Sequence, residues 1–186
     1  MDLKCCVFIA ASVDGFIARP DGDIGWLHKP EYETAELNGV TYESFIATVD
    51  ALVMGRKTLE KVLSFPEWPY EGTPVIALSR QRLELPEHLE GKVEVMAGDV
   101  TSLVVALAER GMKHLYIDGG QTVQAFLEAG LVDELIITRI PVLLGQGIPL
   151  FSQVGSEHGL RHVGTQVSDN GFVQSRYQLT AGTRAA

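Results

Sequence analysis

The sequence predicts an α/β protein with a mostly parallel sheet that ends in an antiparallel hairpin. Short apolar runs of strand length alternate with amphipathic segments, which is the pattern of strands joined by helices. An Asn170-Gly171 pair separates two alternating segments near the end of the chain, and such a pair is the strongest short-range hairpin signal. The 186 residues contain no repeat, low-complexity run or linker, so one domain over residues 1–181 is expected, followed by a tail at 182–186.

The individual elements follow from apolar runs, their spacing and the turn residues between them. Strands are expected over residues 4–11, 50–54, 73–78, 93–96, 114–117, 134–142, 160–167 and 172–179. Helices are expected over 32–48, from Arg56 to about 63, over 102–109, and from about 120 to 129. Asp99 or Thr101 caps the third of these helices, and Gly130 ends the fourth. Residues 12–26 are expected to form a polar, glycine-rich loop.

Composition and charge exclude several classes of protein. Hydrophobic residues make up 46 % of the chain and charged residues 21 %, which is too apolar for a disordered chain. The longest apolar runs are far shorter than a membrane span, and the N-terminus has no secretory signal pattern, so a cytoplasmic protein is expected. The net charge of −9 opposes binding to nucleic acid or to an anionic membrane.

The two cysteines, Cys5 and Cys6, are adjacent in the sequence. Neighbours on a strand point to opposite faces, so a disulfide between them is not expected. Two cysteines are also too few ligands for a metal site, and no metal is expected. Both are predicted to be small apolar residues of the first strand, which suits a reducing compartment.

Chemistry is expected where strands end, because open α/β sheets bind ligands at the carboxyl ends of their strands. The run Gly55-Arg56-Lys57-Thr58 joins a strand to a helix and places two cations and a hydroxyl at the helix N-terminus. Cations oppose the helix dipole there, so an anion site is favoured over an ordinary solvated first turn.

Two further strand ends carry residues that suit phosphate groups. Leu78-Ser79-Arg80 offers a hydroxyl and a guanidinium for a phosphate monoester, although Ser-Arg is also a common loop pair. Gly119-Gly120-Gln121-Thr122 forms a glycine turn between a strand and a helix, which suits a pyrophosphate or, alternatively, a tight turn without a ligand. The spacing is not a GxGxxG fingerprint, so an ordinary Rossmann domain is not indicated.

Six short motifs follow one another along nearly the whole chain. They are Ile9-Ala-Ala-Ser-Val-Asp-Gly15-Phe-Ile17, Asp21-Gly-Asp-Ile-Gly-Trp26-Leu27, Met54-Gly-Arg-Lys-Thr58, Leu78-Ser-Arg80, Ile117-Asp-Gly-Gly120 and Ile140-Pro-Val-Leu-Leu-Gly145-Gln-Gly147-Ile-Pro-Leu-Phe151. Each motif is weak alone, but in this order they resemble the dihydrofolate-reductase-like superfamily. The last motif is more similar to the RibD C-terminal domain family, the pyrimidine reductase of riboflavin biosynthesis and its stand-alone relatives, than to dihydrofolate reductase itself.

The resemblance implies a central, mostly parallel mixed sheet of about eight strands with helices on both faces, and hydride transfer from NADPH. The matching positions imply a cofactor site made of Ala10, Ile17, Gly55, Arg56, Lys57, Thr58, Leu78, Ser79, Arg80, Gly119, Gly120, Gln121 and Thr122. In that site Ala10 and Ile17 would line the nicotinamide, and Ser79 and Arg80 would take the 2′-phosphate. A methyl group on Gly120 would then collide with the bound pyrophosphate.

The resemblance leaves the substrate side less defined. Trp26 in the mobile loop and Thr138 on the long strand match substrate-binding positions. Dihydrofolate reductases place a carboxylate shortly after this tryptophan, and the same distance here leads to Glu31. Asp23 is the alternative acid, because Gly25 occupies the place where stand-alone relatives carry one. Glu31 is also explained as an ordinary first-turn acid.

The leading interpretation is an NADPH-dependent reductase of a small pterin-like or pyrimidine-like substrate, such as the riboflavin-pathway 5-amino-6-(5-phosphoribosylamino)uracil. The alternatives are a dihydrofolate reductase proper, or a non-catalytic nucleotide-binding module that retains the fold. The expected partners are the small-molecule substrate and, as one option, a second copy of the chain in a homodimer.

Overall fold

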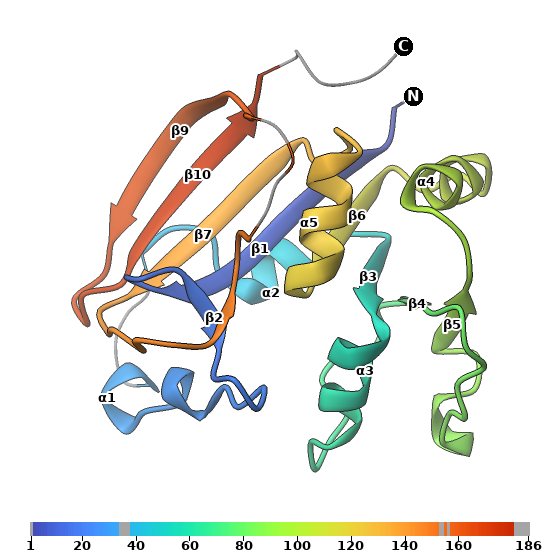
Figure 1. The fold of residues 1–186 in the computed structure, drawn as a ribbon, viewed down its shortest axis with the longest axis horizontal. Helices are drawn as coiled ribbons and strands as arrows, with labels where there is room; N and C mark the ends of the chain where they lie inside the picture. The colour runs from blue at the N-terminus through green and yellow to red at the C-terminus, as the bar shows by residue number, and fades with distance from the viewer. Residues whose placement is uncertain (1, 34–37, 153–154, 156, 181–186) are drawn as a thin grey trace.

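The computed structural model describes residues 2–33, 38–152, 155 and 157–180. Its centre is an eight-stranded sheet with the strand order β5-β4-β3-β6-β1-β7-β10-β9 (Figure 1). The strands are β1 (Lys4–Ser12), β3 (Ala51–Gly55), β4 (Val75–Leu78), β5 (Val93–Met96), β6 (His114–Asp118), β7 (Glu134–Ile140), β9 (Leu160–Val167) and β10 (Val173–Leu179). The predicted α/β class and the eight strands are confirmed.

The sheet is parallel from β5 to β7 and antiparallel beyond β7, where β10 pairs with both β7 and β9. The predicted hairpin is therefore confirmed as β9 and β10. Gly171 lies in its turn with a φ of +81°, a conformation that L-residues rarely adopt. Because six neighbouring strands run in parallel, their carboxyl ends meet at one edge of the sheet.

Helices cover both faces of this sheet, as expected. They are α1 (Pro30–Glu33), α2 (Tyr42–Ile46), α3 (Arg56–Leu63), α4 (Val100–Glu109) and α5 (Gly120–Glu128), with short 3-10 helices at Gly25–Leu27 and Glu87–Leu89. One apolar core includes Cys5 of β1 together with Phe126 of α5, and the other includes Cys6 together with Phe45 of α2. Adjacent strand residues point to opposite faces, so these two cores lie on opposite sides of the sheet.

The helix predicted over residues 32–48 is wrong as one continuous element. α1 ends at Glu33, residues 34–37 lie outside the described residues, and α2 begins only at Tyr42. Between them Gly39 has a φ of +111°, which is incompatible with a right-handed helix. Thr41 then starts α2 as its N-cap, accepting a hydrogen bond from the N–H of Ser44. The apolar residues whose spacing predicted one helix over residues 32–48 therefore belong to separate segments.

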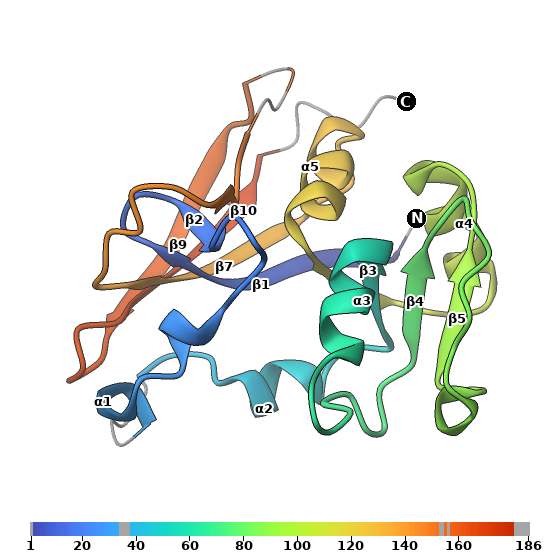
Figure 2. The ribbon, with the colours of Figure 1, turned by 60° about the horizontal axis from the view of Figure 1, so that its bottom comes forward.

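The loop predicted over residues 12–26 contains regular structure. Phe16–Ala18 forms β2, which pairs antiparallel with β8 (Ile148–Pro149) in a small second sheet (Figure 2). Asp14 reinforces this junction, because its carboxylate accepts the N–H groups of Leu144 and Gly145 at 3.1 and 2.8 Å. The first and last sequence motifs therefore form one structural unit beside the carboxyl ends of β1 and β7.

Three general observations hold for the described part of the chain. No helix in it is long and apolar enough to cross a bilayer. Cys5 and Cys6 are both buried and are not joined in a disulfide. Within the same residues, no group of three or more His, Cys, Asp or Glu side chains is placed to hold a metal ion.

Candidate cofactor and substrate site

The carboxyl ends of β3 and β6 bring two helix N-termini side by side. α3 begins directly after Gly55, and α5 begins directly after Gly119. A Cβ atom on Gly55 would lie 3.0 Å from Thr122 Oγ1, and one on Gly119 would collide with Thr58 Oγ1. Each glycine therefore permits the close approach of the other helix. The structure brings these four predicted site residues together.

These two N-termini differ from those of α2 and α4 by their caps. Thr41 caps α2 and Asp99 caps α4, each accepting a backbone N–H with its side chain, as was predicted for Asp99. α3 and α5 instead have glycine N-caps and no side-chain cap hydrogen bond. First-turn N–H groups without a side-chain acceptor, together with the helix dipole, favour an anion. Two such N-termini in contact suit a ligand with two linked phosphates.

Basic side chains add positive charge at the start of α3. Lys57 is exposed, and Arg56 is partly buried. The Nη1 of Arg56 donates to Glu60 Oε1 at 2.8 Å, one helical turn further along. This ion pair is half exposed, so it is weak and can rearrange when a stronger anion arrives.

The predicted site for a 2′-phosphate lies next to this helix start. β3 and β4 are parallel neighbours, with Gly55 opposite Leu78, so Ser79 and Arg80 emerge beside α3. The Ser79 hydroxyl accepts the N–H of Gln81 at 3.1 Å and donates to its carbonyl oxygen at 2.8 Å. Arg80 is exposed, and no ion pair involves it among the described residues.

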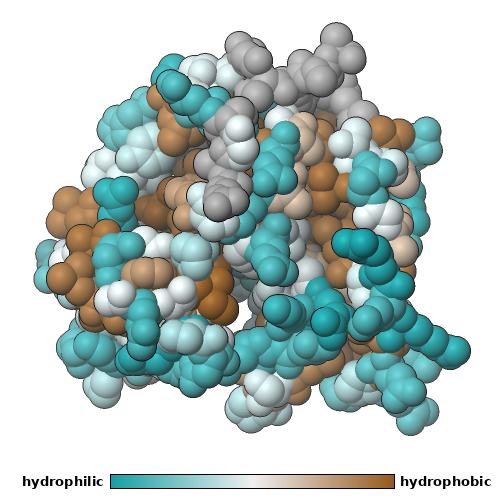
Figure 3. Space-filling view, viewed as in Figure 1, coloured by the Kyte–Doolittle hydropathy of each residue, from teal (hydrophilic) through white to brown (hydrophobic). Residues whose placement is uncertain are grey.

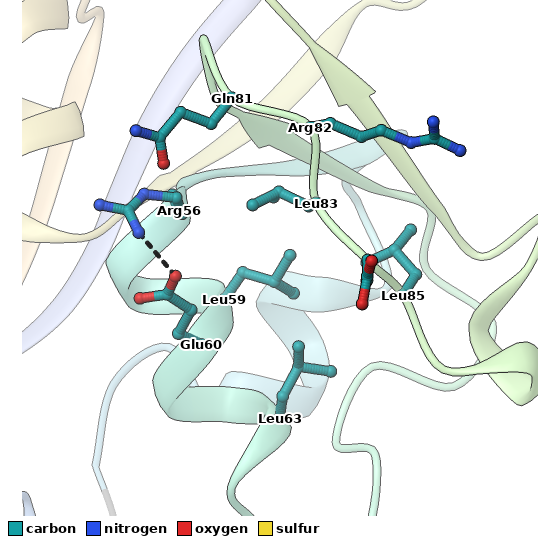
Figure 4. A pocket seen from close by; sticks show the side chains of 9 residues that line it. Arg56, Leu59, Glu60, Leu63, Gln81, Arg82, Leu83 and Leu85 are labelled. Carbon is teal, nitrogen blue, oxygen red and sulfur yellow. Dashed lines mark hydrogen bonds and ion pairs between the residues drawn. The ribbon is translucent and has the colours of Figure 1, made fainter.

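A pocket of about 250 Å³ lies between α3 and the segment that follows β4 (Figure 4). Arg56 and Gln81 lie on one side of it, and Arg82 points away from it. The leucines Leu59, Leu63, Leu83 and Leu85 supply its apolar lining. Arg56 is therefore placed between this pocket and the paired helix N-termini.

β2 and β8 form a wall against the start of α5. A Cβ atom on Gly120 would lie 3.2 Å from both Ile17 Cδ1 and the carbonyl oxygen of Pro149. Such a methyl group would therefore press against these protein atoms, and its expected collision with a bound pyrophosphate stays a prediction. Figure 3 shows a gap in the surface between the part of the chain that carries β2 and the part that carries α3, near the N-terminus of α5. Gln121, the remaining predicted residue of this turn, is exposed.

Ala10 of β1, predicted to line the nicotinamide, and Thr138 of β7, predicted to bind the substrate, lie opposite each other. Ala10 pairs with Thr138, and Thr138 pairs with Gln174 of β10. Gln174 Nε2 donates to Thr138 Oγ1 at 3.2 Å and to the carbonyl oxygen of Val40 at 2.9 Å, and Gln174 Oε1 accepts the N–H of Val40 at 2.7 Å. This side chain fixes the segment before α2 against the sheet.

Trp26 is 2 % exposed and lies in the short helix Gly25–Leu27. Its indole Nε1 is buried and has no hydrogen-bond partner among the described residues. A buried donor without an acceptor is unfavourable, so this N–H suits a ligand or a bridging water. The position agrees with the predicted role in substrate binding, which stays a prediction.

The structure does not support either predicted acid. The Glu31 side chain is 64 % exposed and lies 3.9 Å from Lys29 Nζ, so it lacks the apolar surroundings that the hypothesis required. Asp23 accepts hydrogen bonds from Arg19 Nε and from the N–H of Gly25, which fixes it in the local turn. Both assignments are therefore withdrawn. The Glu31 side chain is exposed to solvent, and the Asp23 side chain is paired within its own turn.

Asp118, at the end of β6, is an acid that the sequence reasoning did not select. Burial raises its pKa from the ordinary value of 3.8 to about 6, and the N–H of Gly119, which donates to Oδ1 at 2.8 Å, opposes this shift. The side chain shares a face of β6 with Tyr116, on the side of the sheet that α2 and α3 cover. The sequence signal that could have identified Asp118 is a carboxyl at the end of an apolar strand, directly before Gly119 and Gly120.

Comparison with known proteins agrees with this geometry. The sequence matches the family model described as the RibD C-terminal domain over residues 4–174. The chain belongs to this family. The uncharacterized protein YwjB of Bacillus subtilis is 36 % identical over 170 residues, covering 89 % of this chain and 92 % of that protein. Dihydrofolate reductase HdrB of Haloferax volcanii is 33 % identical over 129 residues, covering 68 % and 62 %.

Solved structures of RibD C-terminal and dihydrofolate reductase type share the fold. A putative riboflavin biosynthesis protein from Shewanella sp. PV-4 has a TM-score of 0.86 and 39 % identity, over 96 % of this chain and 99 % of that one. Dihydrofolate reductase from Enterococcus faecalis has a TM-score of 0.64 and 18 % identity, over 95 % and 96 %. The predicted dihydrofolate-reductase-like fold is confirmed, and the chain has the fold of a reductase of the riboflavin-pathway type.

Proposed function

We propose that this RibD C-terminal domain protein is a reductase that uses NADPH to reduce a small heterocycle of the pterin or pyrimidine class. The observation that carries the proposal is the contact between two helix N-termini without side-chain caps, at Gly55 and Gly119, beside the basic residues Arg56, Lys57 and Arg80. This arrangement fits a dinucleotide with linked phosphates and a further phosphate at one end.

Each group of residues would hold a different part of the cofactor. The first-turn N–H groups of α3 and α5 bind the linked phosphates, with Thr58 and Thr122 at their contact. Ser79, Arg80 and Arg56 bind the 2′-phosphate. Ile17 lies against Gly120 at the start of α5, and with Ala10 it positions the nicotinamide. When bound, the cofactor supplies the hydride.

The protein must also orient the acceptor and exclude water where β1, β7 and β10 lie side by side. Ala10, Thr138 and Gln174 follow one another across three strands there, and Trp26 offers a buried N–H. Reduction of a C=N bond also needs a proton. Burial raises the pKa of Asp118 to about 6, so this carboxyl keeps a proton closer to neutral pH than an ordinary one does, and we assign it this role within the proposal.

The test measures the oxidation of NADPH, monitored by the loss of its absorbance, with reducible pteridines and aminopyrimidines as acceptors. Turnover with one of these classes is the expected result. Tight NADPH binding in the absence of turnover with either class would instead support the non-catalytic nucleotide-binding module. A dihydrofolate reductase proper, a second candidate favoured by the similarity to HdrB, requires turnover with dihydrofolate in the same assay.

A further inference from the structure

A second pocket, with a volume of about 260 Å³, lies where β1 and β7 end beside β8. It is lined by residues 11–15, Ile137, Arg139, Leu150 and Phe151. β2 and β8 lie on the same side of the large sheet as α5 (Figures 1 and 2), and Ala11 and Ile137 belong to the core that contains Phe126 of α5. The pocket therefore lies on the α5 side of the sheet.

The sheet separates this pocket from the proposed substrate side. Ala11 pairs with Arg139 across β1 and β7, and Ala10 pairs with Thr138 one residue earlier. Adjacent strand residues point to opposite faces, so the side chains of these two pairs lie on opposite sides of the sheet. None of the residues that line the pocket is among those proposed above to hold the cofactor or the substrate. The pocket is therefore a separate place in the molecule.

The walls of the pocket are largely apolar. Ala11, Ile137 and Leu150 are nearly completely buried, whereas Val13 and Phe151 are 57 % and 42 % exposed. The N–H of Leu150 donates to the carbonyl oxygen of residue 15 at 2.9 Å, which holds the wall after β8 against the turn after β1. Small-molecule sites in proteins are mostly apolar hollows with a few polar groups that orient the ligand. This pocket has that composition.

Two polar side chains of the pocket already have partners within the protein. The hydroxyl of Ser12 donates to Asp14 Oδ1 at 2.6 Å and accepts the N–H of Phe16 at 3.0 Å. The carboxylate of Asp14 also accepts two backbone N–H groups of the segment between β7 and β8. Three hydrogen bonds therefore hold Asp14 at the wall of the pocket, and its charge opposes a second anion close to it.

Arg139 is the polar side chain of the pocket that has no partner. It is exposed, and it forms neither an ion pair nor a hydrogen bond within the part of the chain that the structure describes. By contrast, the side chains of Arg56, Arg110 and Arg176 each pair with a glutamate. A guanidinium has the planar fork of donors that matches a carboxylate. The pocket thus combines apolar walls with one unpaired cation.

We propose that this pocket is a second ligand site, which binds a small organic carboxylate with an apolar body of about one ring. Arg139 donates to the carboxylate, and the side chains of Ile137, Leu150 and Phe151 contact the ring. A cavity of about 150 Å³ is enough for benzene, so the volume of about 260 Å³ accommodates a ring and its carboxylate. The charge of Asp14 selects monoanions over dianions. This site goes beyond the proposed reductase function and does not depend on it.

The test uses phenylacetate as the probe, with phenylacetamide and acetate as controls. A ¹H–¹⁵N NMR titration of the full chain measures each dissociation constant and shows which backbone amides respond. Phenylacetate should bind with a dissociation constant of about 1 mM or lower, as expected for a ligand of this size. Phenylacetamide lacks the charge and acetate lacks the ring, so each should bind at least about fivefold more weakly. Equal binding of either control, or no saturable binding of phenylacetate at millimolar concentrations, would overturn the inference.

Variants attribute the binding to the pocket. Arg139→Gln should weaken phenylacetate at least about fivefold and leave phenylacetamide nearly unchanged, because only the charged ligand loses a charge-assisted hydrogen bond. Phe151→Ala should weaken both ring compounds about two- to fivefold through lost apolar contact. Both side chains are exposed, so both variants should fold. Arg80→Gln, an equal change of charge at the proposed cofactor site, should leave the binding of phenylacetate unchanged. An equal loss in the Arg80 and Arg139 variants, or a loss in the Arg80 variant alone, would contradict the assignment.

The responding amides separate this inference from the proposed function. The largest shifts should belong to Val13, Arg139 and Phe151, and the amides of Gly55 and Gly119 should move little. The same pattern should persist when NADPH is present in excess, since the two sites share no residue. Largest shifts at Gly55 and Gly119, or loss of phenylacetate binding in NADPH, would overturn the inference and leave the reductase proposal standing. Failure to oxidise NADPH with any acceptor would remove the reductase proposal and leave the carboxylate site unaffected.

Discussion

Gly119 lies so close to the hydroxyl of Thr58 that no side-chain atom fits between them. Gly119 precedes α5, and Thr58 belongs to the first turn of α3. The two helices therefore start within contact distance, and the glycine is required twice, for its φ of +90° and for the missing Cβ. The relative position of the two proposed phosphate-binding N-termini depends on this contact and on the one between Gly55 and Thr122.

Replacement of Gly119 by Ala should therefore lower the free energy of unfolding by more than backbone strain alone would. Gly91→Ala is the matched control, because Gly91 has a φ of +78° but open space around its Cβ position. We expect Gly91→Ala to cost about 1 kcal/mol of unfolding free energy and Gly119→Ala at least about twice that. Urea unfolding of both variants checks the difference, and equal losses would show that the contact with Thr58 is unimportant.

The cofactor preference should depend on Arg80. A charge-assisted hydrogen bond contributes about 1.5–3 kcal/mol, so Arg80→Ala should weaken NADPH binding by about 10- to 100-fold. NADH lacks the 2′-phosphate, and its dissociation constant should stay nearly the same. Titration of both cofactors at two salt concentrations checks this, because the variant should also show a flatter salt dependence for NADPH. Equal affinity of the unaltered protein for both cofactors would contradict the assignment.

Glu60 should compete with the phosphate of the proposed cofactor for Arg56, since Glu60 and Arg56 form an ion pair at 2.8 Å. Glu60→Gln should free the guanidinium and tighten NADPH binding by about two- to fivefold, the range expected for an exposed pair. Glu109→Gln, an exposed change on α4, serves as the control for net charge. Weaker NADPH binding in Glu60→Gln would mean that Glu60 positions Arg56 instead of competing for it.

The parts of the fold that depend on neighbouring residues were predictable from the sequence. The α4 cap at Asp99, the helix after Gly55 and the hairpin around Gly171 each have a local signal, and all three are present. β2 and β8 were missed, because strands of three and two residues acquire their meaning only from pairing across about 130 positions of sequence.

The choice of a candidate acid for the site shows the same limit of prediction from local sequence. Glu31 was selected by its distance from Trp26 along the chain, but Gly39 interrupts the expected helix and Glu31 faces solvent. Asp118 was overlooked because the burial that raises its pKa is not visible in the residues next to it in the sequence. Local pattern located the turns that are proposed to bind phosphate, whereas burial of a carboxyl depends on tertiary packing.

The ion pairs of Glu134, away from the proposed site, allow a test of what stabilises the fold. It is 1 % exposed and is ion-paired with both Lys4 and Arg176, which are themselves partly exposed. Lys4→Met or Arg176→Met alone should cost little, because one cation remains. The double variant leaves a buried carboxylate without a cation and should lose about 3–5 kcal/mol.

Denaturant unfolding of the two single variants and the double variant gives the coupling between them. Arg110→Met is the control, because it removes one partner of the exposed pair with Glu94 and should cost less than about 1 kcal/mol. Additive losses in the Lys4 and Arg176 variants would show that the two cations act independently, so that neither compensates for the loss of the other at Glu134.

Asp118 should lower the stability of the protein at alkaline pH. Burial raises its pKa from 3.8 to about 6, so the folded state binds the proton more tightly than the unfolded state does. The free energy of unfolding therefore falls as the pH rises from about 4 to 6, and the full penalty is present above that window. A shift of about two pH units corresponds to about 3 kcal/mol, and partial exposure of the side chain makes about 1–3 kcal/mol the expected range.

Asp118→Asn removes this penalty while its Oδ1 can still accept the N–H of Gly119. The variant should be more stable than the unaltered protein at pH 8 and equally stable at pH 3.5, when measured by urea unfolding across this range. Asp50→Asn provides the opposite case, because backbone N–H groups of Lys113 and His114 lower the pKa of Asp50. That variant should be less stable at pH 8, and its deficit should shrink on acidification. A gain for Asp118→Asn that is the same at both pH values would show that the carboxyl does not carry a burial penalty, and its assignment as the proton-holding group would then lose its physical basis.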